Sequence, residues 1–142
     1  MKRQTYLQFR HSIDEAKSLN EKIDLLWGFS EIYWDCFRTE ISELLESEMK
    51  DCIAKKHLDG EIIFRVLLSR IYADSLQFDK AMQYVTIIRR QLPNVTDIKV
   101  IAYSKMFLSI LELYRGNYDG AFDLVVQSMK DYEGFEEHQN YG

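Results

Sequence analysis

The side chains that could do chemistry in this chain are few, and paired carboxylates are the first to consider. Glu43 and Glu46 stand three residues apart on a predicted helix, a spacing that places both on one helix face. Two carboxylates can do acid–base work when they are buried together. These two belong to the acidic outer side of their helix, so we expect them to be solvated rather than catalytic.

Histidine and cysteine offer no metal or nucleophile constellation either. The three histidines, His11, His57 and His138, are scattered, and the two cysteines, Cys36 and Cys52, lie in predicted helices without metal-ligand spacing. We therefore predict no metal and no cofactor. The thiols are typical of a cytoplasmic protein that keeps its cysteines reduced.

The common motifs of enzyme active sites are also missing. The six glycines never cluster, and neither a Gly-Lys-Ser/Thr run nor a Gly-x-Ser-x-Gly elbow occurs. No catalytic residue is predicted, and an enzyme is the least favoured of the function classes considered.

Charge and hydropathy exclude two further classes of partner. The net charge of −5 would repel a phosphate backbone, and the short basic clusters Lys55–His57 and Arg89–Arg90 have acidic neighbours, so nucleic acid is not expected. Residues 1–16 lack the apolar core of a signal peptide, and no run approaches the ~20 apolar residues of a membrane span. We expect a cytoplasmic location.

The elements that would position a site are helices. With 142 residues the chain has the length of one domain, and 46% hydrophobic residues exclude a disordered chain. One proline and six glycines leave little room for the turns of a β fold. Apolar spacing predicts helices over residues 1–19, 21–38, 40–56, 60–75, 79–92, from Thr96 to Tyr114, and 118–132, with Asn20, Thr39, Asp59 and Thr96 as N-caps.

The clearest local pattern is a helix–turn–helix unit over residues 68–93. Ser69 and Tyr72 share a face of its first helix, Phe78 stands at the turn, Ala81 follows on the second helix, and Pro93 marks the end. The intervening stretch is too short for anything but a tight turn, so the two helices must fold back on each other.

This order of residues resembles the tetratricopeptide (TPR) repeat, a helix–turn–helix family of interaction scaffolds. The pattern recurs 40 residues later, with Tyr118 in the place of Phe78 and Ala121 in the place of Ala81. These units are longer than the family period of about 34 residues. Glu112 replaces Tyr72 in the second unit, and Arg65 and Lys105 occupy a place that the family often fills with tryptophan.

The resemblance implies an all-α solenoid of three antiparallel helix pairs behind an extra N-terminal helix. We expect a single domain that divides into an N-terminal helix at 1–19, a degenerate pair at 20–57, clear units at 60–93 and 96–132, and a tail without a helix at 133–142.

The resemblance also implies a binding groove, because the first helices of TPR pairs line a concave surface. Carried onto this chain, the groove positions are Tyr33, Trp34, Val66, Arg70, Asp74, Tyr103, Met106, Ile110 and Tyr114, with Leu26 and Ser30 as less certain equivalents. Arg70 would supply a contact to a carboxylate or phosphate of the partner. The alternative is that several of these side chains, Trp34 above all, pack between helices.

Two functions stay open at this point. The first is a non-catalytic module that binds a protein or peptide. It would be the N-terminal regulatory part of a bacterial signalling protein such as a diguanylate cyclase, because units near this length resemble the TPR regions attached to such proteins. The second is a structural protein that forms a homodimer through an uncapped C-terminal face made of Phe122, Val126 and Met129.

Overall fold

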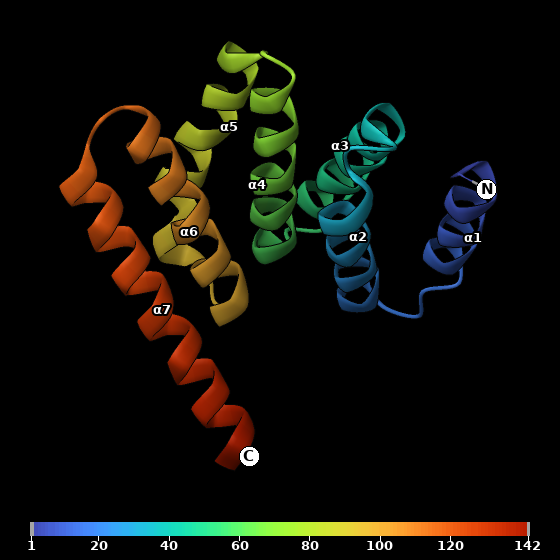
Figure 1. Cartoon of the computed structure of the whole chain (residues 1–142). Coiled ribbons are helices and arrows are strands. Elements are labelled where there is room, and N and C mark those ends of the chain that lie inside the picture. Colours follow the sequence, from blue (N-terminus) through green and yellow to red (C-terminus); the bar gives the residue numbers. More distant parts are fainter. Residues whose placement is uncertain (1, 142) are drawn as a thin grey trace.

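The protein is all-helical. A computed structural model describes the backbone of residues 2–141 and the side chains from Arg3 to Gly134. Within that range there is no β-strand, and Figure 1 shows helices throughout. Their bounds are α1 Lys2–Asp14, α2 Leu19–Tyr33, α3 Arg38–Ala54, α4 Leu58–Asp74, α5 Phe78–Gln91, the 3-10 turn Leu92–Asn94, α6 Ile98–Tyr114 and α7 Tyr118–Tyr141.

The predicted helices are all present, and the predicted tail is wrong. Residues 133–142 were expected to start no helix, whereas α7 continues as far as Tyr141. Figure 1 shows this helix projecting beyond α6. The predicted histidine His138 lies outside the described side chains. No helix of the described part is long and apolar enough to cross a membrane.

Helix α4 is the centre of the fold. It packs against α2, α3, α5 and α6, and Figure 1 shows it between these neighbours. Every residue from 62 to 69 is buried, including Phe64 and Leu68 at 0% exposure. A helix that is surrounded in this way needs apolar residues on all sides. This explains why α4 lacks the polar face that its neighbour α5 has.

The helix starts differ from the predicted caps by one or two residues. Ser18, not Asn20, caps α2, because its hydroxyl accepts a hydrogen bond from Glu21 N at 3.1 Å. Thr39 lies inside α3, which begins at Arg38 after Phe37. Asn20 has another contact, since its Oδ1 lies 3.3 Å from the Nε2 atom of His57.

Asp59 joins two units rather than capping its own helix. His57 caps α4 by accepting from Gly60 N through Nδ1, at 2.9 Å. The Asp59 carboxylate instead accepts from the backbone N–H and the hydroxyl of Thr96 and from Asp97 N, at 2.9–3.0 Å. Asp97, not Thr96, then caps α6. The starts of α4 and α6 are thereby fixed to each other.

Three tight turns share one backbone conformation. The turns α3–α4, α4–α5 and α6–α7 each place one residue in the left-handed region, Lys56 (φ 55°), Leu76 (φ 61°) and Gly116 (φ 81°). Only Gly116 is free of the steric cost that a Cβ carries there. The small residues Ala81 and Ala121, just after two of these turns, are 4% and 2% exposed, as predicted.

Arg65 and Lys105, two cations 40 residues apart, are each paired with a nearby carboxylate. Arg65 donates to Glu61 at 2.9 Å and lies over the ring of Tyr84, 5.1 Å from its centroid. Lys105 of α6 contacts Asp131 of α7 at 2.7 Å. Two positions 40 residues apart therefore use a cation to hold the following helix.

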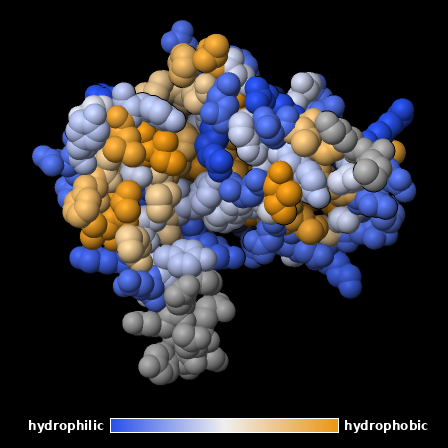
Figure 2. Space-filling model, in the orientation of Figure 1, coloured by the Kyte–Doolittle hydropathy of each residue, from blue (hydrophilic) through white to orange (hydrophobic). Residues whose placement is uncertain are grey.

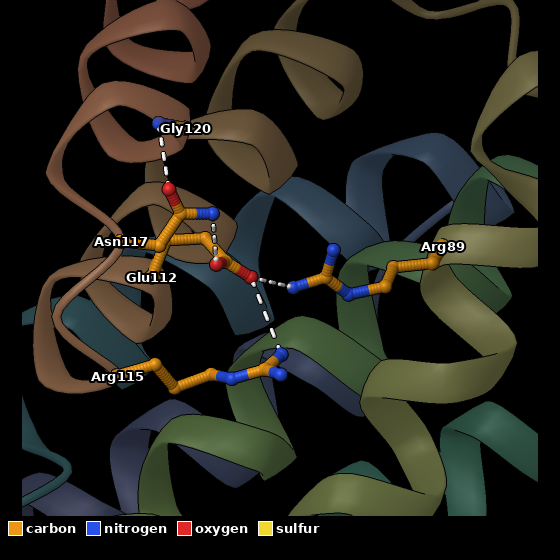
Figure 3. Close-up of polar contacts among 5 residues, drawn as sticks. All are labelled: Arg89, Glu112, Arg115, Asn117 and Gly120. Carbon is orange, nitrogen blue, oxygen red and sulfur yellow. Dashed lines mark hydrogen bonds and ion pairs between the residues drawn. The ribbon is translucent and has the colours of Figure 1, made fainter.

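Glu112 explains the second departure from the repeat pattern (Figure 3). Its carboxylate accepts from Arg89 of α5 at 2.6 Å and from Asn117 at 3.0 Å, with Arg115 at 3.5 Å. These hydrogen bonds, first from Asn117 and then from Arg89, lower the pKa of Glu112. Asn117 in turn caps α7 by accepting from Gly120 N.

Tyr72, the counterpart of Glu112 in the first unit, also contacts the preceding helix. Its hydroxyl donates to Glu46 of α3, which also accepts from Tyr84 at 2.7 Å. Burial and then Glu46 raise the pKa of Tyr84 to about 12. Glu46 is thus bonded and half-buried, contrary to the solvated face expected for it.

Candidate functional site

An apolar hollow lies between α2, α6 and α7. Its volume is about 660 Å³, within the range of small-ligand and peptide-anchor pockets. The residues that line it are Asp24, Trp27, Gly28, Glu31, Lys99, Ala102, Tyr103, Met106, Ser128, Met129, Tyr132 and Glu133. We call this hollow the α2–α6–α7 groove.

A polar cluster from three helices forms one side of the groove. Arg70 Nη1 of α4 donates to Glu31 Oε1 of α2 at 2.6 Å and also to the hydroxyl of Tyr103 on α6. The Tyr103 hydroxyl itself donates to Glu31 Oε1. Because each member contacts the other two, the cluster holds α2, α4 and α6 together at one point.

Tyr103 is a neutral phenol in this setting. Burial, followed by the Glu31 carboxylate, raises the pKa of Tyr103 above its ordinary value, although Arg70 acts in the opposite direction. Its ring also meets Trp27 edge to face, with 4.9 Å between centroids. Such a pair offers a partner rigid apolar area beside a polar tip.

Charged side chains surround the apolar centre of the groove. Asp24 and Glu133 carry negative charge at its edge, and Lys99 lies 4.0 Å from Asp24. Glu31 is balanced by Arg70. The groove is therefore an apolar surface with a slight excess of carboxylates around it.

Three of the predicted groove residues come together at this site. Tyr103 and Met106 line the groove, and Arg70 reaches it through its contacts with Tyr103 and Glu31. Met129, predicted as part of a self-association face, lines the same groove from α7. Phe122 and Val126 of that face are not among the lining residues.

The other predicted groove positions lie elsewhere. Val66 is 0% exposed and belongs to the core. Tyr33 contacts Phe29 with a tilted ring and Phe37 edge to face, and the guanidinium of Arg38 lies over the ring of Trp34, 5.1 Å from its centroid. These three side chains are used in packing.

The positions at the far end of the first helices are exposed but do not line the groove. Asp74 is exposed at the end of α4, outside the residues that form the hollow. Ile110 is 41% and Tyr114 is 85% exposed on α6. Of the predicted self-association face, Phe122 is 68% exposed and Val126 is half-buried.

Sequence reasoning placed α2 in the groove but chose a different face of this helix. The α2 residues in the groove are Asp24, Trp27, Gly28 and Glu31. The predicted equivalents Leu26 and Ser30 are 1% and 3% exposed. The spacing of 24, 27, 28 and 31 is a helical stripe, so the stripe could be found from the sequence. The sequence alone does not show that this stripe, rather than the neighbouring one with Leu26 and Ser30, faces the groove.

Among the groups considered first for chemistry, the described histidines have polar partners and Cys52 is buried. Both ring nitrogens of His57 face polar atoms, and the exposed His11 pairs with Glu15 at 3.0 Å. Burial raises the pKa of the Cys52 thiol to about 11, which leaves it unreactive. Among the described side chains no group of three or more His, Cys, Asp or Glu residues could hold a metal ion.

A second hollow, of about 610 Å³, lies between α3 and the α4–α5 turn. It is polar, and its lining includes Glu46 and Tyr72, which already bond to each other. The α2–α6–α7 groove therefore remains the better candidate for a binding site.

No protein-family model matches the chain, and no curated protein or solved structure matches it either.

Proposed function

We propose that this chain is a non-catalytic TPR-like module that binds a protein or peptide partner in the α2–α6–α7 groove. In this proposal α2–α3, α4–α5 and α6–α7 are the three antiparallel pairs of an α-solenoid, and α1 packs before them. In this arrangement the groove lies on two of the first helices, α2 and α6, and on α7, the second helix of the third pair.

The observation that carries the proposal is the lining of the groove. Aromatic and methionine side chains from separate helices, Trp27, Tyr103, Met106, Met129 and Tyr132, surround one hollow of about 660 Å³. Aromatic residues are enriched where binding energy concentrates, and methionine adapts to partners of differing shape.

The cluster around Arg70 adds a second support. Its three members come from α2, α4 and α6, the first helices of the proposed pairs. A shared cluster fixes these helices relative to one another, and a fixed surface loses less entropy when it binds.

The direct test is to select peptides that bind the parent protein and to measure their binding to a variant whose groove is blocked. The probe is a displayed library of random peptides, each roughly 11 residues or three helical turns long. A Cβ at Gly28 meets nothing within 4 Å and Gly28 lines the hollow, so the indole of Gly28→Trp is placed to fill the groove. Gly134→Trp is the matched control, since Gly134 is equally unobstructed and does not line the groove.

The proposal expects enriched peptides that bind the parent and Gly134→Trp, and lose at least tenfold in affinity for Gly28→Trp. Enriched peptides that bind Gly28→Trp as tightly as the parent, or a selection that enriches no peptide, would contradict the proposal.

The resemblance also carries a proposal about context, namely that the module regulates a bacterial signalling protein such as a diguanylate cyclase. This part rests on the length of the units alone. It would be tested by measuring whether a groove-binding peptide changes the output activity of the natural reading frame that holds this sequence.

A second candidate function is self-association through the α6–α7 surface. Phe122 is 68% exposed on α7, and Ile110 and Leu113 are 41% and 49% exposed on α6, where Figure 2 shows hydrophobic surface. Sedimentation equilibrium of the parent and of Phe122→Asp separates the two functions. A dimer that Phe122→Asp dissociates would support the structural protein, and a parent that stays monomeric would exclude it.

A further inference from the structure

We propose that the partner segment of the α2–α6–α7 groove is an amphipathic helix whose apolar anchors are flanked by lysine or arginine. This inference rests on the proposed function and adds the chemistry of the ligand. It also reverses the sequence-based expectation, in which Arg70 would recognise a carboxylate or phosphate.

The first step concerns Arg70, which is already neutralised. Its Nη1 atom donates to Glu31 at 2.6 Å and to the Tyr103 hydroxyl. An acidic ligand would have to displace the Glu31 carboxylate, leaving that half-exposed anion beside the incoming one. An acidic partner is therefore disfavoured at the point where the sequence alone suggested it.

The second step is the charge around the groove. With Glu31 and Arg70 balanced, Asp24 and Glu133 face the single cation Lys99 among the lining side chains. The whole chain carries −5. Complementary charge at the edge of an interface selects partners and speeds their encounter. A partner with lysine or arginine next to its apolar anchors would pair these cations with Asp24 and Glu133.

The third step is the mixture of aromatic rings and carboxylates. Trp27, Tyr103 and Tyr132 line the same hollow as Asp24 and Glu133. Aromatic faces attract cations, arginine more often than lysine, and they also cover the apolar stems of these side chains. The groove can thus accept both an apolar anchor of the ligand and the lysine or arginine next to that anchor.

The fourth step is the form of the ligand. In the described residues there is no strand whose edge a peptide could extend, and the groove is walled by helices whose backbone groups bond internally. On α6 the lining residues Lys99, Ala102, Tyr103 and Met106 repeat at helical spacing. Over that span the stripe is about 10 Å long. Side chains at the same spacing on a ligand helix would match it.

The experiment is the composition of the peptides enriched from the displayed library of about 11-residue random peptides. Among peptides that need an open groove, shown by loss of binding to Gly28→Trp, we expect Lys and Arg to be enriched next to apolar residues spaced three and four apart. The double reversal Asp24→Lys and Glu133→Lys should weaken such peptides by roughly five- to tenfold. It should also favour acidic peptides in a repeated selection.

Asp74→Lys is the matched control. Asp74 was a predicted groove residue, but it is exposed outside the groove, so its reversal should leave the affinity of the enriched peptides unchanged. Groove-dependent peptides without basic enrichment, or with affinities that Asp24→Lys and Glu133→Lys do not lower, would overturn this inference and leave the proposed function standing. Absence of any groove-dependent peptide would overturn both.

Discussion

Glu31 and Arg70 lie 39 residues apart in the chain, on α2 and α4, and their side chains meet at 2.6 Å. Tyr103 of α6 contacts both. Arg70, the one cation that the sequence analysis placed in the groove, is therefore part of the scaffold. The predictions that follow start from it.

Arg70→Ala should lower stability, because Arg70 belongs to the cluster that joins α2, α4 and α6. Without the guanidinium, Glu31 and Tyr103 lose a shared donor at a half-exposed site, so we expect a loss of roughly 0.5–1.5 kcal/mol in the free energy of unfolding. Urea unfolding measures it. Asp74→Ala, on the same helix, is the control and should stay near the parent. Equal stability of the two variants would show that the cluster contributes nothing.

Two glycine-to-alanine changes should act in opposite directions. A Cβ at Gly60 would lie 2.7 Å from Cys52 Sγ and 2.9 Å from Ile23 Cδ1, because α4 starts close against α3 and α2. Gly60→Ala should cost roughly 1–3 kcal/mol. At Gly28 nothing lies within 4 Å, so alanine there should stabilise helix α2 by up to about 1 kcal/mol. Thermal unfolding of both variants tests the pair, and a shift of the same sign would contradict it.

The shared turn conformation predicts a stabilising change. Leu76 adopts φ 61° and is 77% exposed, so its side chain has the cost of a left-handed backbone without the benefit of burial. Leu76→Gly should raise the free energy of unfolding by roughly 0.5–1 kcal/mol. Gly116→Ala, at the equivalent turn, should lower it by a similar amount. Equal effects of the two substitutions would mean that the turns are not equivalent.

The Glu112 network should make stability depend on pH. Hydrogen bonds from Asn117 and Arg89 lower the pKa of Glu112 below 4.5 in the folded protein. A carboxyl with a lowered folded-state pKa contributes stability above its unfolded pKa and loses it as pH falls through the folded value. Glu112→Gln should therefore differ most from the parent above the unfolded-state pKa of about 4.3 and approach it as pH falls below that value. Urea unfolding over this range should show the convergence, and a difference independent of pH would contradict it.

The helices and the groove differ in how far the sequence predicts them. Helices α4 to α6 begin and end within about two residues of the predicted bounds because tight turns and Pro93 interrupt a strong apolar period. The end of α2 was placed too late, since Trp34 and Phe37 continue the aromatic pattern after the helix has stopped at Tyr33. Helix α7 was ended too early, although Gly134 does not interrupt it.

The groove was only partly predictable, for two physical reasons. The α2 unit has no small residue at the crossing position that would fix its register, so the stripe with Leu26 and Ser30 was chosen instead of the one with Trp27 and Gly28. The partners of Arg70 come from helices 39 and 33 residues away. Helical periodicity identifies a face, but it says nothing about which distant side chains meet there.

The central claim, that the α2–α6–α7 groove binds the partner, is tested most directly by methyl NMR of the methionines. Met106 and Met129 line the groove, Met49 is 4% exposed in the core, and Met82 is 43% exposed on α5, outside the groove. We predict that titration with a peptide selected from the library shifts the methyl signals of Met106 and Met129 and leaves those of Met49 and Met82 in place. Shifts at Met82, or binding that leaves Met106 and Met129 unmoved, would contradict the account.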